Sequence, residues 1–212
     1  MTEAELRESL CMHGKSLYDR GLSGGSTGNM SVMLDDRSAL LCTPTNSCLG
    51  RLDPARISKV DMDGRLLDGD KPTKEVFLHM AMLRQRPNDR AVVHLHTTYS
   101  VAVSCLDGLD PADVLPAITP YYIMRVNRLP LVPYYRPGDL ALADAVSGLA
   151  RDHHAILLAN HGTLMSAKSL DTAVYATEEL EETAKLYFIL QGRETRGLTG
   201  EQIEDLRRHF PT

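Results

Sequence analysis

Hydrophobic and polar positions along the chain alternate with two periods, one that suits helices and one that suits strands. Residues 170–190 show the clearest helical spacing, and Gly192 follows them as a residue that readily ends a helix. Similar spacing predicts helices over residues 3–20 and 201–210, and Thr73 is expected to cap a further helix. The inward positions of the longest predicted helix are Leu170, Val174, Thr177, Glu181, Ala184 and Phe188.

Short apolar runs bounded by turn residues predict the strands. NMSVML and ALLCTP, joined by DDRS, predict a hairpin, and AVVHLH, PLVPYY and AILLAN predict three further strands. RISKV predicts a strand before a turn at DGR, and residues 98–106 predict a helix. Because helices lie between most of these strands, we expect an α/β fold whose sheet is covered on both faces. The chain has no internal repeat or linker, so residues 1–212 are expected to form one domain.

Composition and charge narrow the classes of partner. The 212 residues are 43% hydrophobic and 24% charged with a net charge of −5, so neither nucleic acid nor an anionic membrane is an expected partner. The acidic N-terminal segment does not resemble a signal peptide, and residues 91–106, the longest uncharged run, are too short and polar to span a bilayer. We expect a cytoplasmic protein whose four cysteines, which form no C-x-x-C pair, are thiols.

Two histidines interrupt the apolar run AVVHLH. Side chains two residues apart on a strand share a face, so His94 and His96 are expected to lie side by side. His161 follows the predicted strand AILLAN in an NHG turn, and Glu75 falls in the first turn of its predicted helix. Three imidazoles and one carboxylate are a typical ligand set for a divalent cation, and zinc suits it best. For the H-x-H pair alone, the alternative is two hydrogen-bonded core histidines.

The other histidines are interpreted as structural. His79 lies one helical turn after Glu75 and is a second candidate ligand, but its apolar context, FLHMAM, favours core packing. The remaining four lie in charged segments and are expected to be exposed: His13, His153, His154 and His209.

A glycine-rich stretch, GGSTGNMS at residues 24–31, suits the binding of an anion. Glycines allow backbone N–H groups to converge, and Ser26, Thr27 and Asn29 add side-chain donors. Lys74, at a predicted helix start, adds a cation beside the positive end of the helix dipole. The stretch matches neither the P-loop nor the GxGxxG pattern, and its alternative interpretation is a flexible turn.

Five collinear motifs carry a family resemblance: GSTGNMS, TPT, DKPTKE, AVVHLH and LLANHG. In this order and at these distances they resemble the class II aldolase/adducin family over nearly the whole chain. Five segments resemble the branch of 3-oxo-tetronate 4-phosphate decarboxylases: SCLGRLDP, GDKPTKEV, HLHTTYSVAVSCLDGLD, PLVPYYRPGD and EELEETAKLYFIL. The position after TPT is commonly Gly in the family and is Asn46 here.

The resemblance implies a three-layer α/β/α domain around a mixed, mostly antiparallel sheet, assembled as a homotetramer with active sites between subunits. It implies one divalent metal per subunit, zinc or manganese, on His94, His96 and His161. Glu75 is implied as a further metal ligand that becomes the proton-transfer group once substrate displaces it. The implied phosphate contacts are Gly28, Asn29, Thr45, Thr73 and Lys74.

The activity implied by the branch is metal-dependent decarboxylation of 3-oxo-tetronate 4-phosphate in four-carbon acid sugar catabolism. Loss of CO2 leaves an enediolate, and its protonation gives dihydroxyacetone phosphate. The alternative is a class II sugar-phosphate aldolase resembling L-fuculose-1-phosphate aldolase, or an epimerase, because an aldolase makes the same enediolate by removing that proton. A non-catalytic adducin-like module is disfavoured, because it has no need for the complete ligand set.

Overall fold

The computed structural model describes residues 1–136 and 138–211, which form one sheet with helices packed on it. The strands are β1 (Asn29–Met33), β2 (Leu40–Cys42), β3 (Ser58–Val60), β4 (Leu66–Asp68), β5 (Ala91–Leu95), β6 (Leu131–Val132), β7 (Ala155–Leu158) and β8 (Gly162–Ala167). The α-helices are α1 (Glu3–Asp19), α2 (Val76–Gln85), α3 (Thr98–Ser104), α4 (Pro120–Arg125), α5 (Leu140–Ala150), α6 (Leu170–Leu190) and α7 (Gly200–His209), and two short 3₁₀ helices are η1 (Leu49–Arg51) and η2 (Pro54–Arg56).

The sheet has the strand order β4-β3-β2-β1-β5-β8-β7-β6. Every neighbouring pair is antiparallel except β6 and β7, which are parallel. β5 lies at the centre, and its register places His94 opposite Asn29 on β1 and opposite Leu164 on β8. The predicted mixed, mostly antiparallel sheet is confirmed.

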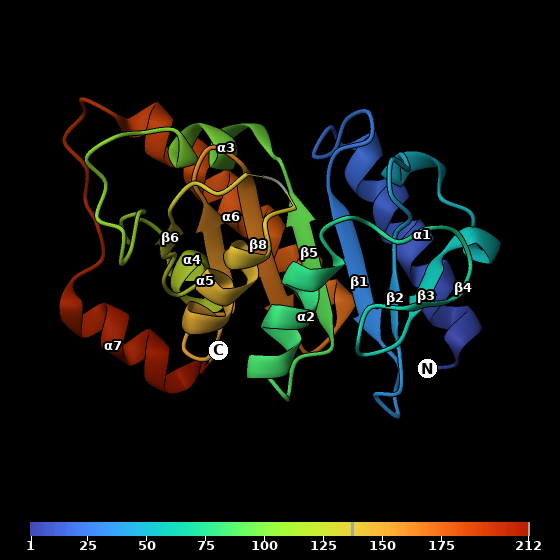
Figure 1. Cartoon of the computed structure of the whole chain (residues 1–212). Coiled ribbons are helices and arrows are strands. Elements are labelled where there is room, and N and C mark those ends of the chain that lie inside the picture. The colour runs from blue at the N-terminus through green and yellow to red at the C-terminus, as the bar shows by residue number, and fades with distance from the viewer. Residues whose placement is uncertain (137, 212) are drawn as a thin grey trace.

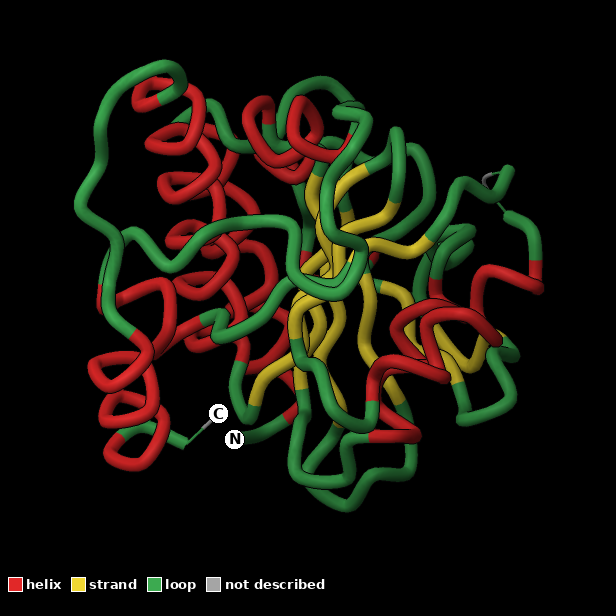
Figure 2. Tube along the Cα trace, turned by 90° about the vertical axis from the view of Figure 1, so that its left-hand side faces the viewer, coloured by secondary structure: helices red, strands yellow, loops and turns green. Residues whose placement is uncertain are grey.

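Helices cover both faces of the sheet, which confirms the predicted three layers (Figure 1). On one face Val93 and Leu95 of β5 pack in a core with α1 and α6, while Val92 packs on the other face with α2 and α5. His94 alternates with Val93 and therefore points to the α2 and α5 side. Figure 2 shows the strands between helices on both sides.

The elements that were not predicted are α4, α5, β4, β8 and the two 3₁₀ helices. The apolar run GTLMSA was interpreted only through the preceding NHG turn, but it forms β8 and returns antiparallel to β7. The start of α2 also differs from the prediction. Thr73 does not cap the helix, which begins at Val76 with Glu75 at the N-cap, and the Thr73 hydroxyl instead accepts a 3.3 Å hydrogen bond from the Glu75 backbone N–H.

Of the four histidines expected to be exposed, His209 is exposed, His153 is half-buried, and His13 and His154 are buried. His13 and His154 are 5% and 8% exposed. The partner of His13 is distant in the sequence, because its ring lies 2.9 Å from Asp171 on α6. The His154 ring donates instead to the backbone carbonyl of Arg125, at 2.9 Å. No described helix is long and apolar enough to cross a membrane.

Buried neutral histidines make the stability of this fold depend on pH. Burial lowers the pKa of His154 and lowers that of His79 to about 3. Histidine in the unfolded chain has a pKa of about 6.5. Below this pH the unfolded state binds protons that the buried histidines do not bind, so acid favours unfolding. Each such group contributes a slope of up to about 1.4 kcal/mol per pH unit.

We expect the free energy of unfolding of chelator-treated protein to fall as the pH drops from about 6.5 to about 5. His154→Gln should flatten this slope, because it removes one group that binds a proton only when unfolded. Urea denaturation at several pH values measures the effect. His209→Gln, on exposed α7, is the matched control and should keep the wild-type slope. Equal slopes for all three proteins would contradict the assignment.

Candidate functional site

Four predicted ligands from separate parts of the chain converge on one point. Glu75 precedes α2, His94 and His96 come from the end of β5, and His161 lies in the turn between β7 and β8. One ligand atom from each residue lies within 4.8 Å of all the others. The two oxygens of Glu75 lie 3.3 Å from His94 Nε2 and 3.1 Å from His161 Nε2.

The sheet fixes which nitrogen of His94 faces the cluster. Its Nδ1 donates to the backbone carbonyl of Thr163 on the neighbouring strand β8, at 2.7 Å. The Nε2 atom therefore carries a lone pair. It lies 2.9 Å from Nε2 of His96, so two imidazole nitrogens and a carboxylate oxygen face one another.

Burial sets the charges in the cluster. It lowers the pKa of fully buried His94, and together with the neighbouring His94 and His161 it lowers the pKa of His96 to about 4. Burial would raise the pKa of Glu75. The hydrogen bonds from His161 and from the amide of Asn29 outweigh this effect and hold the pKa of Glu75 well below its usual range. At neutral pH the cluster therefore combines neutral His94 and His96 with an ionised carboxylate.

The donor set fits a divalent cation. Converging lone pairs and a carboxylate repel one another unless a positive charge lies between them. Three imidazoles with one carboxylate are ligands that zinc and other first-row divalent ions accept. The carbonyl of Thr163 behind His94 is the type of outer partner that orients a ligating imidazole.

A pocket of about 290 Å³ opens beside the cluster and is lined by Glu75 and His96. The same pocket is lined by all five residues predicted to contact phosphate: Gly28, Asn29, Thr45, Thr73 and Lys74. The structure thus brings two of the four predicted metal ligands and all of the predicted anion contacts to one cavity. Lys74 is exposed, and among the described residues it forms no ion pair.

Backbone geometry explains two residues of this pocket. Gly28 has a φ of +75°, and a Cβ there would lie 2.8 Å from Leu95 Cδ2 and 3.0 Å from the His94 carbonyl oxygen. Only glycine therefore allows the loop to lie against the end of β5. Asn46 has a φ of +56°, which is the left-handed region that Asn tolerates better than most residues. A positive φ suits both this Asn and the Gly that the family resemblance leads us to expect here.

Two sets of contacts that hold the site were not predicted from the sequence. Asn29 donates from Nδ2 to Glu75 at 2.8 Å, and its Oδ1 lies 2.6 Å from Nε2 of His79. The carboxylate of Glu181 accepts from the backbone N–H groups of Tyr99 and Ser100, each at 2.8 Å, and so holds the start of α3 directly after His96. A glutamate at an inward position of a helix was the available signal for the second set, because a buried carboxylate needs donors.

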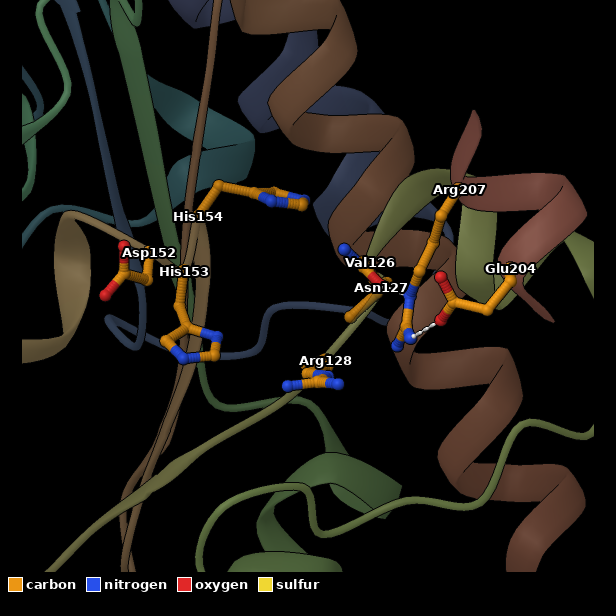
Figure 3. A pocket seen from close by; sticks show the side chains of 8 residues that line it. All are labelled: Val126, Asn127, Arg128, Asp152, His153, His154, Glu204 and Arg207. Atoms are coloured by element: carbon orange, nitrogen blue, oxygen red, sulfur yellow. Dashed lines mark hydrogen bonds and ion pairs between the residues drawn. The ribbon is translucent and has the colours of Figure 1, made fainter. Parts of the chain in front are cut away.

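A larger pocket of about 540 Å³ shares no residue with this site. It is lined by Val126, Asn127, Arg128, Asp152, His153, His154, Glu204 and Arg207 (Figure 3). Its charges are of both signs, and Arg207 already pairs with Glu204 at 2.7 Å. The ligand set and the larger pocket are therefore separate features.

Known proteins resemble this chain over nearly its whole length. A relative from Escherichia coli strain K12, named 3-oxo-tetronate 4-phosphate decarboxylase, is 53% identical and covers 97% of this chain and 96% of its own. A relative of the same name from Haemophilus influenzae is 49% identical, covering 97% and 98%. An L-fuculose phosphate aldolase from Methanocaldococcus jannaschii is 37% identical, covering 81% and 90%.

Solved structures share the fold. The crystal structure of YgbL from Escherichia coli matches with a TM-score of 0.94 and 52% identity, covering 97% of this chain and 99% of that one. An L-fuculose 1-phosphate aldolase matches with a TM-score of 0.89 and 28% identity, covering 100% and 99%. Residues 8–188 match the family model described as Class II Aldolase and Adducin N-terminal domain. The chain therefore belongs to the class II aldolase and adducin family.

Proposed function

We propose that this protein decarboxylates 3-oxo-tetronate 4-phosphate to dihydroxyacetone phosphate and CO2. The observation that carries the proposal is the shared cavity, in which Glu75 and His96 stand beside Gly28, Thr45 and Lys74. A substrate bound by its phosphate at the donor-rich side would present its other end to the cluster. The names of the relatives that are about half identical to this chain support this substrate.

We assign one divalent metal per chain to His94, His96, His161 and Glu75. The histidine-rich set favours zinc, with manganese second. When bound, the cation supplies a Lewis acid that stabilises the negative charge left on the substrate as CO2 departs. Within this family, we thus propose that the protein is a lyase that uses zinc or manganese.

Phosphate recognition falls to the opposite side of the pocket. Thr45 and Thr73 offer hydroxyl donors, and Lys74 offers a mobile cation that no described carboxylate neutralises. A phosphate needs several donors and positive charge, and charge-assisted bonds are the strongest of these. Asn29 lines the same pocket and donates to Glu75, so it connects the phosphate side to the carboxylate.

Glu75 is the residue that we assign to proton transfer. CO2 leaves without a proton, so an acid is needed only afterwards, to protonate the carbon that has lost it. In the free protein the lowered pKa of Glu75 keeps the carboxylate ionised. The carboxylate and phosphate of the substrate bring negative charge next to it, and this raises its proton affinity.

Aldol cleavage of a sugar phosphate is the second candidate, favoured by the 37% identical L-fuculose phosphate aldolase. Both reactions use the same cation, phosphate contacts and proton-transfer group. We further propose a cytoplasmic homotetramer with the site between neighbouring subunits, as the family resemblance implies. The exposed aromatic rings of Tyr121 and Tyr134, 56% and 63% exposed, suit such contacts.

Gly162 lies against the proposed metal ligands. A Cβ at this position would lie 2.4 Å from the Leu95 carbonyl oxygen and 3.0 Å from His96 Cδ2. Because the first of these atoms is backbone, β5 and β8 would have to move apart where β5 ends. We expect Gly162→Ala to weaken divalent metal binding by about 10- to 100-fold, as changes behind metal ligands commonly do.

Titration of metal-free protein with Zn²⁺ or Mn²⁺ measures the affinity of this variant. The matched control is Gly148→Ala, because a Cβ on Gly148 of α5 meets no atom within 4 Å. The control should bind metal as the wild type does and gain about 0.5–1 kcal/mol in stability. Wild-type affinity in Gly162→Ala would place the metal elsewhere.

We expect Lys74→Ala to raise the KM for the phosphorylated substrate. Loss of one charged partner of a phosphate costs about 1.5–3 kcal/mol, which is roughly 10- to 150-fold. Lys71→Ala is the control, since this exposed lysine carries the same charge three residues earlier but does not line the pocket. Equal activity of the wild type on phosphorylated and unphosphorylated substrate would remove phosphate recognition from the proposal.

We expect the wild type to release CO2 from 3-oxo-tetronate 4-phosphate and, in heavy water, to place one deuterium on the carbon that lost it. Glu75→Gln should keep substrate affinity and lose most turnover, because an amide does not deliver the proton. Mass spectrometry of the product and a metal assay on each protein are the measurements. Metal-dependent condensation of dihydroxyacetone phosphate with an aldehyde, without CO2 release, would establish the aldolase instead.

A further inference from the structure

A chain of hydrogen bonds runs from the core to Glu75. Ser31 Oγ lies 2.7 Å from Nδ1 of His79, Nε2 of His79 lies 2.6 Å from Oδ1 of Asn29, and Asn29 Nδ2 lies 2.8 Å from Oε2 of Glu75. Ser31 and His79 are fully buried, and Asn29 is 6% exposed. These hydrogen bonds join β1 to α2. Of the four residues, Asn29 and Glu75 line the pocket, and Ser31 and His79 do not.

Donor and acceptor rules give this chain one direction. An ionised carboxylate only accepts, so the amide nitrogen of Asn29 must face Glu75 and the amide oxygen must face His79. An amide oxygen also only accepts, so His79 carries its hydrogen on Nε2. The Nδ1 atom is then an acceptor, and the Ser31 hydroxyl donates to it.

We propose that His79 is a positioning residue, which fixes the orientation of the Asn29 amide and thereby holds Glu75 in place for proton transfer. The role of Glu75 is that of the proposed function, on which this inference rests. Without the donor on His79, the Asn29 amide can rotate and turn its oxygen toward the carboxylate. The two acceptors then repel each other, and Glu75 leaves its place.

His79 does not act as a proton carrier in this arrangement. Burial lowers its pKa to about 3, so the ring stays neutral during turnover. It also touches neither the phosphate side of the pocket nor Lys74. Loss of His79 should therefore lower kcat and leave the KM for the phosphorylated substrate nearly unchanged. If His79 only filled space in the core, a substitution of equal volume would leave kcat unchanged.

Two substitutions of nearly equal volume separate these roles. His79→Gln places an amide N–H where Nε2 of the ring stood, and so restores the donor to Asn29. His79→Met fills the same space with no donor. We expect kcat of the Gln variant to stay within about threefold of the wild type and kcat of the Met variant to fall at least about tenfold, since the loss of an orienting partner commonly costs 10- to 100-fold.

A readout without turnover accompanies the kinetics. In metal-free protein, hydrogen exchange of the Asn29 side-chain amide, followed by NMR, should be slow in the wild type and the Gln variant and fast in the Met variant. Because His79 acts through Glu75, adding His79→Met to Glu75→Gln should lower the residual rate no further. If the Met variant does not fold, His79→Asn takes its place, since its shorter amide reaches Ser31 but not Asn29.

The outcomes distinguish this inference from the proposed function. Absence of CO2 release by the wild type would overturn the decarboxylase proposal and would leave the amide exchange test of His79 intact. Wild-type kcat and slow amide exchange in a folded His79→Met protein would overturn the positioning role. An equal loss of kcat in the Gln and Met variants, with equal thermal stability, would also overturn it.

Discussion

The site depends on one electrostatic constraint, the burial of an ionised carboxylate among three imidazoles. Glu75 and the Nε2 atoms of His94 and His161 lie within about hydrogen-bonding distance, in a place where water does not separate them. Such a group of acceptors is costly to assemble unless a cation or fixed donors offset the repulsion. The local structure supplies one such donor and fixes the direction of one lone pair. Asn29 donates to the carboxylate, and the Thr163 carbonyl orients one ring so that its lone pair faces inward.

The sheet makes this arrangement rigid. β5 lies between β1 and β8, so the strand that carries His94 is hydrogen-bonded on both sides. Asn29 stands opposite His94 in the register with β1, and Thr163 on β8 stands opposite Leu95. A one-residue slip of β1 or β8 against β5 would turn the side chains of the shifted strand to the other face of the sheet. The register of β1 and β8 against β5 therefore determines both the packing at the centre of the sheet and the positions of the proposed ligands.

Local patterns allowed part of this structure to be predicted. The H-x-H spacing on an extended run required His94 and His96 to share a face. The glycine-rich loop was predicted to bind an anion, and the structure adds that Gly28 lies against the end of β5. The start of α2 could not be predicted from propensity, because the turn at Thr73 is set by pairing across the chain, where its N–H donates to the Thr43 carbonyl. The link from His79 to Glu75 was missed for the same reason. Helical periodicity indicates that a histidine is buried and does not say which residue, 50 positions away, its ring will meet.

Decarboxylase and aldolase members of one family can share this frame because the frame acts on what the two reactions have in common. Both leave negative charge on a carbon next to an oxygen, and both need one proton moved at that carbon. The cation site, the phosphate contacts and the oriented Glu75 address only those shared demands. Selectivity must then arise where the departing group lies, since CO2 leaves without a proton and an aldehyde needs one moved at its oxygen. In this chain the described wall of the pocket offers Lys74 and hydroxyl or amide groups, and Glu75 is its only carboxylate among the described residues.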